Sequence, residues 1–70
     1  MRYRDVARKL RKLGCLETPR RSGGSHRKWH NPATGGNGTI PDRGSRDLKF
    51  GTIRGALRQP GVSPEAFEQA

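Results

Sequence analysis

The stretch that decides the fold is Ser22-Gly23-Gly24-Ser25-His26-Arg27-Lys28-Trp29-His30-Asn31-Pro32. Two glycines predict a turn before His26, and Pro32 closes the segment that follows, so residues 26–31 are expected to form a β-strand. Successive strand side chains point to opposite faces, which places His26, Lys28 and His30 on one face. Arg27 and Trp29 take the other face, where the large indole is expected to pack beneath the rest of the protein.

The segment before this strand predicts a helix and a short strand. Apolar residues recur at helical spacing over residues 3–13, and Gly14 follows them as a natural C-terminal cap. Residues 15–18 are compatible with a short strand. On the other side, residues 32–38 are rich in turn-forming residues and predict a hairpin loop, after which a short third strand starts at residues 39–41.

The C-terminal part predicts two helices. Thr52 is expected to cap the first, Gly55 to leave room in it for close packing, and Pro60-Gly61 to stop it. Ser63-Pro64-Glu65 has the capping serine, proline and acid of a second helix start. The order of elements predicts an α+β fold, with helices on one face of a three-stranded antiparallel sheet. The other sheet face is then open or covered by a partner, and association into homo-oligomers is plausible.

Length and composition restrict the class of protein. Seventy residues are expected to form one domain, 1–70. A single cysteine, Cys15, permits no disulfide within the chain, which fits a reducing cytoplasm, and it is expected to be a buried apolar residue rather than a nucleophile. Neither a signal peptide nor an apolar run of membrane-spanning length is evident, so no membrane partner is expected.

Positive charge is concentrated in the first part of the chain. The formal net charge is +9, and residues 1–30 hold ten Lys or Arg against two acidic residues. Residues 31–70 hold five against four. This imbalance favours one face that binds a polyanion and another that packs or meets a partner, although a solvated basic surface is the plainer alternative.

The residues around His26 suit RNA cleavage. Histidine exchanges protons near neutral pH, and cations attract phosphate. Attack by a 2′-hydroxyl on the adjacent phosphorus needs both a proton carrier and positive charge around the phosphodiester. His26 is therefore the candidate catalytic residue, as acid or base. Six nearby residues are candidates for RNA binding: Arg20, Arg21, Ser25, Arg27, Lys28 and His30.

A metal or cofactor site is not predicted. His26 and His30 have the spacing of a zinc histidine pair, with Cys15 upstream. A second upstream cysteine is absent, however, and positions on a strand do not converge as helix positions do. The glycines at 23–24 are also too few for a nucleotide-phosphate loop, since no Gly-Lys-Ser/Thr follows them.

Three motifs resemble one known family. Gly24-Ser25-His26 with Trp29 and Asn31-Pro32 resembles the active-site strand of HicA toxins, the mRNA interferases of HicA–HicB toxin–antitoxin pairs. Ile40-Pro41 followed by residues 47–54 resembles that family's second signature, and residues 59–67 continue it in register. The motifs stand in the right order over essentially the whole chain.

The resemblance implies a double-stranded-RNA-binding-like fold and a catalytic histidine at His26. It also implies cleavage of mRNA without a metal, and neutralisation by a HicB-like antitoxin that covers the histidine face. Arg43 departs from the pattern, because the family often has a second histidine there. Pro60 and the glycine-rich hairpin tip also depart from it, but none of these positions touches residues 24–26.

Two other functions stay open. The first is a non-catalytic RNA-binding module with the same fold, which recognises RNA by shape and phosphate contacts and does not cleave it. The second is a basic adaptor for an acidic protein, which would show no salt-dependent affinity for RNA.

Overall fold

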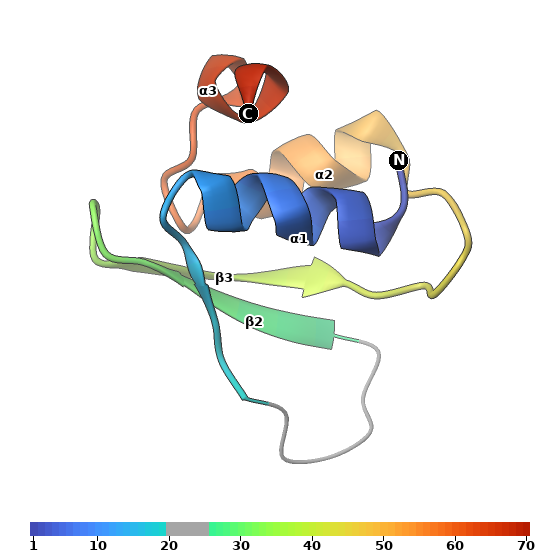
Figure 1. The fold of residues 1–70 in the computed structure, drawn as a ribbon, viewed down its shortest axis with the longest axis horizontal. Helices are drawn as coiled ribbons and strands as arrows, with labels where there is room; N and C mark the ends of the chain where they lie inside the picture. The colour runs from blue at the N-terminus through green and yellow to red at the C-terminus, as the bar shows by residue number, and fades with distance from the viewer. Residues whose placement is uncertain (20–25) are drawn as a thin grey trace.

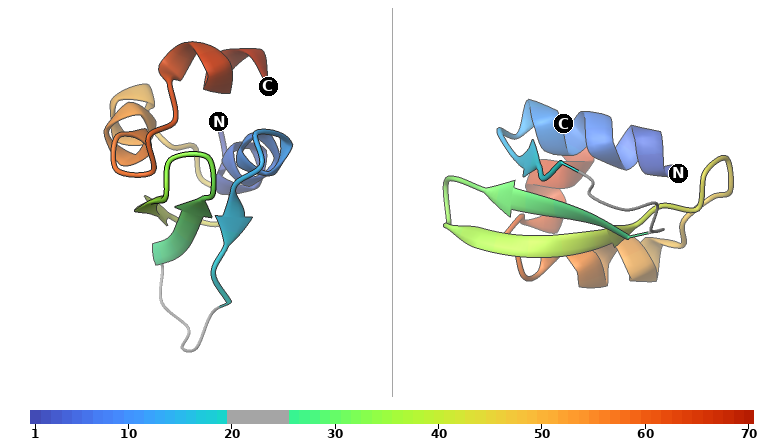
Figure 2. Two further views of the ribbon diagram at one scale, coloured as in Figure 1. Left: turned by 90° about the vertical axis from the view of Figure 1, so that its left-hand side faces the viewer. Right: turned by 90° about the horizontal axis from the view of Figure 1, so that it is seen from below.

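The computed structural model describes residues 1–19 and 26–70 (Figure 1). Its elements are α1 (Tyr3–Lys12), β1 (Leu16–Glu17), β2 (His26–Asn31), β3 (Gly36–Pro41), α2 (Phe50–Leu57) and α3 (Pro64–Gln69). The strands form an antiparallel sheet in the order β1-β2-β3. All three helices lie on one side of that sheet (Figure 2). The predicted α+β architecture is confirmed.

The first helix buries the predicted apolar stripe. Its buried residues are Tyr3, Val6, Ala7 and Leu10. At the start, the Arg2 backbone N–H donates to the Asp5 carboxylate at 3.0 Å. At the end, Gly14 adopts a φ of +88°, and the Cys15 N–H donates to the Leu10 carbonyl at 2.9 Å. This left-handed glycine cap ends α1 and turns the chain into β1.

Strand β2 has the predicted bounds and the predicted alternation. Trp29 is 1% exposed beneath the helices, whereas His26 and Lys28 are exposed on the opposite face. Cys15 is also buried in the core, as predicted. Asn31 is the buried polar residue of β2, and its amide donates to the Pro60 carbonyl at 2.7 Å. That bond ties the end of β2 to the segment after α2.

A chain of hydrogen bonds connects the buried indole to the edge of the sheet. Trp29 Nε1–H donates to the Tyr3 hydroxyl at 3.0 Å, and that hydroxyl donates to the Glu17 carboxylate. The Arg27 guanidinium lies 3.5 Å from Glu17 and 3.1 Å from Asp42. Burial, and next the bond to Glu17, raise the pKa of Tyr3, so its hydroxyl stays protonated as a donor.

Removing the indole should destabilise the protein strongly. We expect Trp29→Ala to lower the free energy of unfolding by about 3–5 kcal/mol, because it leaves a large cavity between the sheet and the helices. Urea denaturation followed by circular dichroism measures this change. A variant that unfolds at the wild-type midpoint would contradict the packing of Trp29.

The Tyr3 hydroxyl should contribute stability that depends on pH. At neutral pH we expect Tyr3→Phe to cost about 1–3 kcal/mol, because it leaves the Trp29 N–H buried without an acceptor. The raised pKa means that this contribution is full below the ordinary tyrosine value of about 10 and declines as the pH rises above it. Denaturation of both proteins between pH 7 and 11.5 should show their stability difference shrinking. A constant difference would contradict the assigned bond.

Strand β3 begins earlier than predicted. The hairpin loop was expected to run to Gly38, but residues 36–38 pair with β2, and Gly35, with a φ of +74°, completes the turn. These glycines are strand residues because Pro60 lies against them. A Cβ on Gly38 would meet Pro60 Cδ at 2.5 Å, and one on Gly36 would meet the Gln59 carbonyl oxygen at 2.4 Å.

The start of α2 and the role of Gly55 also differ from the prediction. The helix begins at Phe50 with Lys49 as its N-cap, so Thr52 is an exposed residue inside it rather than its cap. Burial of Ile53 and Leu57, rather than a capping side chain, fixes this helix. Gly55 faces open space and provides no close packing, because nothing lies within 4 Å of a Cβ built there.

The last helix starts as predicted. The Ser63 hydroxyl accepts a hydrogen bond from the Ala66 N–H at 3.1 Å, and Pro64 occupies the first helical position. Val62 and Phe67 are both buried on either side of this cap. Among the helices of the described residues, none is long and apolar enough to cross a membrane.

Two glycine substitutions should have opposite effects. We expect Gly38→Ala to destabilise the protein by about 1–3 kcal/mol, since its methyl group would displace the Pro60 ring. Gly55→Ala is the matched control, and we expect it to stabilise by about 0.5–1 kcal/mol by favouring the helix. Thermal melts of both variants measure the effects. Equal shifts would contradict the close approach at Gly38.

Candidate nucleic-acid interface

The sheet face opposite the helices carries side chains from all three strands. We call it the outer face, and in the described part of the chain no helix covers it (Figure 2). Strand register places His26 opposite Pro41, Lys28 opposite Thr39, and His30 opposite Asn37. Leu16 and Thr18 extend the face across β1, since Leu16 pairs with His30 and the Thr18 N–H donates to the Lys28 carbonyl at 2.8 Å.

His26 lies at one end of the outer face. It is the first residue of β2, and its side chain is exposed to solvent. Backbone pairing with Pro41 holds this end of the strand against β3. Arg43 follows two residues after Pro41 and is exposed at the same end of the sheet. The arrangement gives His26 a fixed main chain and open access for a large ligand.

The predicted binding residues divide between the two sides of the sheet. Lys28 shares the outer face with His26, about 7 Å further along the strand. Arg27 points to the helix side, where it pairs with Glu17 and Asp42. The other three predicted binding residues lie outside the described residues: Arg20, Arg21 and Ser25.

His30 is on the outer face but distant from His26. They are four positions apart on one strand, which corresponds to about 13 Å. The two rings are therefore too far apart to act on one phosphate group. His30 Nδ1 lies 2.8 Å from the Asn37 amide oxygen, which accepts a hydrogen bond from the Nδ1–H group. This bond orients the ring and leaves Nε2 directed away from Asn37.

Positive potential on the outer face arises from where the acids are placed. The chain has six acidic residues. Five lie in the helices or in connections next to them, and the sixth, Glu17 of β1, turns its side chain to Tyr3 and Arg11 on the helix side; the five are Asp5, Asp42, Asp47, Glu65 and Glu68. Several pair with cations there, as Arg8 does with Asp5 at 3.8 Å and Arg11 with Glu17 at 3.6 Å. The outer face thus has lysine and histidine without a carboxylate beside them.

The two histidines with the spacing of a zinc pair do not come together with Cys15. Cys15 is 2% exposed on the core side of the sheet, and burial raises the pKa of its thiol. His26 and His30 lie on the outer face. Over residues 1–19 and 26–70, no group of three or more His, Cys, Asp or Glu is placed to hold a metal ion.

A hollow on the outer face contains residues that the sequence did not single out. It has a volume of about 330 Å³, and the strand residues around it lie on the pairs Lys28–Thr39 and Trp29–Gly38 and at Asn37. The residues with outward or exposed side chains around it come from β2, β3, the segment after β1 and the turn after α2: Thr18, Lys28, Asn37, Thr39 and Gln59. Assigning residues 36–38 to a strand would have placed Asn37 and Thr39 on this face, because alternation from Ile40 requires it.

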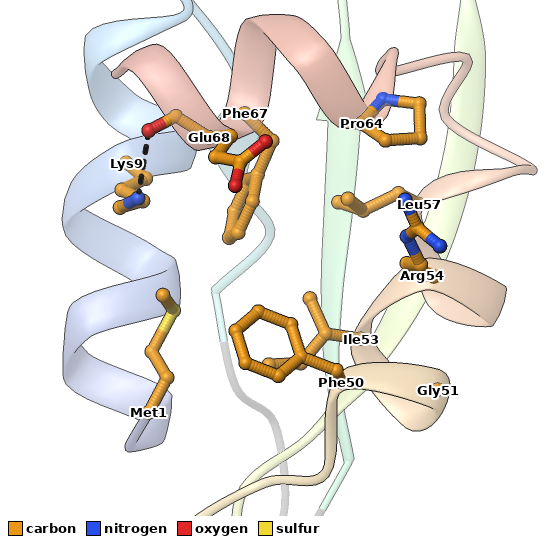
Figure 3. Close-up of a pocket in the computed structure, with 10 residues that line it drawn as sticks. All are labelled: Met1, Lys9, Phe50, Gly51, Ile53, Arg54, Leu57, Pro64, Phe67 and Glu68. Carbon is orange, nitrogen blue, oxygen red and sulfur yellow. Dashed lines mark hydrogen bonds between the residues drawn. The ribbon is translucent and has the colours of Figure 1, made fainter.

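A second cavity lies in the helical layer. It is a groove of about 340 Å³ between α1, α2 and α3, with Phe50, 72% exposed, at its edge (Figure 3). Lys9 Nζ donates to the Glu68 carbonyl at 3.3 Å and lies 5.1 Å from the centre of the Phe67 ring. The groove contains no histidine, and the sheet separates it from His26.

Together, the fold and the outer face define a small basic α+β protein with an exposed histidine on a face suited to a polyanion. The family described as HicA toxin of bacterial toxin-antitoxin has a model that matches residues 3–62 of the 70, so the chain belongs to the HicA toxin family. No curated protein and no solved structure matches it. This match confirms the predicted resemblance. HicA toxins are generally mRNA-cleaving toxins with a cognate antitoxin.

Proposed function

We propose that this chain is an endoribonuclease that cleaves mRNA without a metal, using His26 as its proton carrier. The observation that supports this most directly is the position of His26, which is exposed on a rigid strand with Lys28 on the same face. Membership of the HicA toxin family supports RNA as the substrate.

The reaction we propose is an internal transesterification. His26 removes the proton of a 2′-hydroxyl, whose oxygen attacks the adjacent phosphorus. The bond from phosphorus to the 5′-oxygen breaks, that oxygen takes a proton from solvent, and a 2′,3′-cyclic phosphate remains. Lys28 and Arg43 offset the charge that develops on the phosphoryl oxygens. One proton carrier contributes about 10²–10⁴-fold in rate, which suits a slow toxin.

The proposed RNA contacts lie on the outer face of the sheet and not on its helix side. Lys28 and His30 would contact the RNA strand that binds on the outer face. The phosphate group next to His26 would be bound by Arg20, Arg21 and Ser25. Arg27 receives a structural role instead, because two carboxylates and the Tyr3 ring surround its guanidinium.

The partner we propose is a HicB-like antitoxin that covers the outer face and excludes RNA from it. A net charge of +9 favours an acidic surface on that partner. Residues 1–70 would act as one domain, in the cytoplasm where the mRNA is found.

Cleavage of a long unstructured RNA in the presence of EDTA tests this proposal. We expect the wild-type protein and His30→Ala to cleave, whereas His26→Ala should be at least about 100-fold slower. His30→Ala is the matched comparison: it removes a proposed RNA contact from the same strand face but keeps the proposed proton carrier, so at saturating RNA its rate should stay close to that of the wild type. Thermal melts and RNA binding of His26→Ala should resemble the wild type, since its side chain is exposed.

The outcomes separate the candidate functions. Cleavage by His26→Ala at the wild-type rate would exclude His26 as the proton carrier, and cleavage lost in EDTA would exclude the metal-free mechanism. Salt-sensitive binding by all three proteins with no cleavage would indicate the RNA-binding module.

A further inference from the structure

We propose that the hollow on the outer face binds one unpaired nucleotide adjacent to the cleaved bond and reads its base. The preferred substrate is then single-stranded RNA with a base preference at one position beside the cut. The location of the cut rests on the proposed function, whereas the recognition of an unpaired base does not.

The position and size of the hollow fit a single nucleotide. Its volume of about 330 Å³ is at the lower end of the range for small-molecule pockets. Trp29 and Gly38 also line it, and because both face the core, they contribute main chain to its floor. Of the two β2 residues that line it, Lys28 is the nearer to His26 along the strand, and its ammonium group would hold the phosphate of the bound nucleotide.

The polar groups around the hollow suit a base edge. Asn37 has its amide oxygen engaged by His30 Nδ1 at 2.8 Å, which leaves the Nδ2–H₂ group to donate to an acceptor on a base. Gln59 adds a second amide at the β3 side, and the hydroxyl of Thr39 can donate or accept. An amide side chain can offer a base edge both a donor and an acceptor, as Gln59 would here, whereas Asn37 would offer donors.

The hydrogen bond to His30 holds the Asn37 side chain in one orientation. An exposed asparagine on a strand normally samples several rotamers, and fixing it at both its backbone and its amide reduces the entropy lost on binding. Asn37 is paired with His30 in the strand register as well as through its side chain. The orientation of its free N–H groups is therefore set before RNA arrives.

Only an unpaired base can enter the hollow. The floor of the hollow is main chain of the sheet, so the base edge has to approach the strands closely. Bases in an A-form helix are paired and stacked, and sequence-specific RNA recognition is directed mainly at unpaired bases for that reason. Shape recognition of duplex RNA would need no such recess.

Binding to short RNAs tests the proposal without any cleavage. We would measure fluorescence anisotropy of His26→Ala with labelled eight-nucleotide single strands that vary one position at a time, and with the same sequences in duplex form. We expect single strands to bind at least about tenfold more tightly, with one position where the four bases differ. Adding Asn37→Ala should reduce affinity for the preferred base about tenfold and make the four bases nearly equal there.

Two further variants keep the test specific. Gln59→Ala leaves the bond between His30 and Asn37 intact and should weaken the preference at the same position. Gln69→Ala removes an exposed amide from α3 and should change nothing. Melting curves of each variant establish that it is folded.

The result can overturn this inference independently of the proposed function. Equal binding of duplex and single strand, or an Asn37→Ala loss that is the same for all four bases, would overturn it. A protein that discriminates bases in this assay but does not cleave RNA would overturn the proposed function alone.

Discussion

The buried contact of the Trp29 indole with Tyr3, which combines packing with a hydrogen bond, determines which face of β2 is buried. It joins α1 to the middle strand of the sheet at 3.0 Å, in a core where Trp29 is 1% exposed. Side chains alternate along a strand, so a shift by one residue would turn Trp29 outward and His26 inward. The exposure of His26 on the outer face is thus a consequence of packing on the opposite side of the sheet.

The contact between Gly38 and Pro60 links the helical layer to the same site. Absence of a side chain at Gly38 lets the Pro60 ring lie against β3, and this approach brings the neighbouring Gln59 to the edge of the hollow. Asn31 strengthens the contact by donating to the Pro60 carbonyl at 2.7 Å. Residues that stabilise the fold therefore also shape the surface proposed to bind a nucleotide.

The sequence predicted β2 and its two faces because a strand period needs only local information. It did not predict the start of β3, since glycines at 36 and 38 have turn propensity, and only their contact with residues 59–60 explains them as strand residues. The hollow was missed for the same reason, as Asn37 and Thr39 belong to that strand. Thr52 was expected to start α2 on propensity alone, whereas burial of Ile53 and Leu57 places the start at Phe50.

The distribution of charge between the two sides of the sheet shows why the count of basic residues could not indicate which side would bind RNA. The cations of α1 belong to the helical layer, where carboxylates such as Glu17 lie within 4 Å of two arginines. Among the described residues, fewer cations lie on the outer face, but no carboxylate faces them there. A cation attracts phosphate more strongly when no carboxylate beside it offsets its charge. Within residues 1–19 and 26–70, the face with fewer basic residues is therefore the one on which we propose that a phosphate chain binds, and it is the face that presents His26.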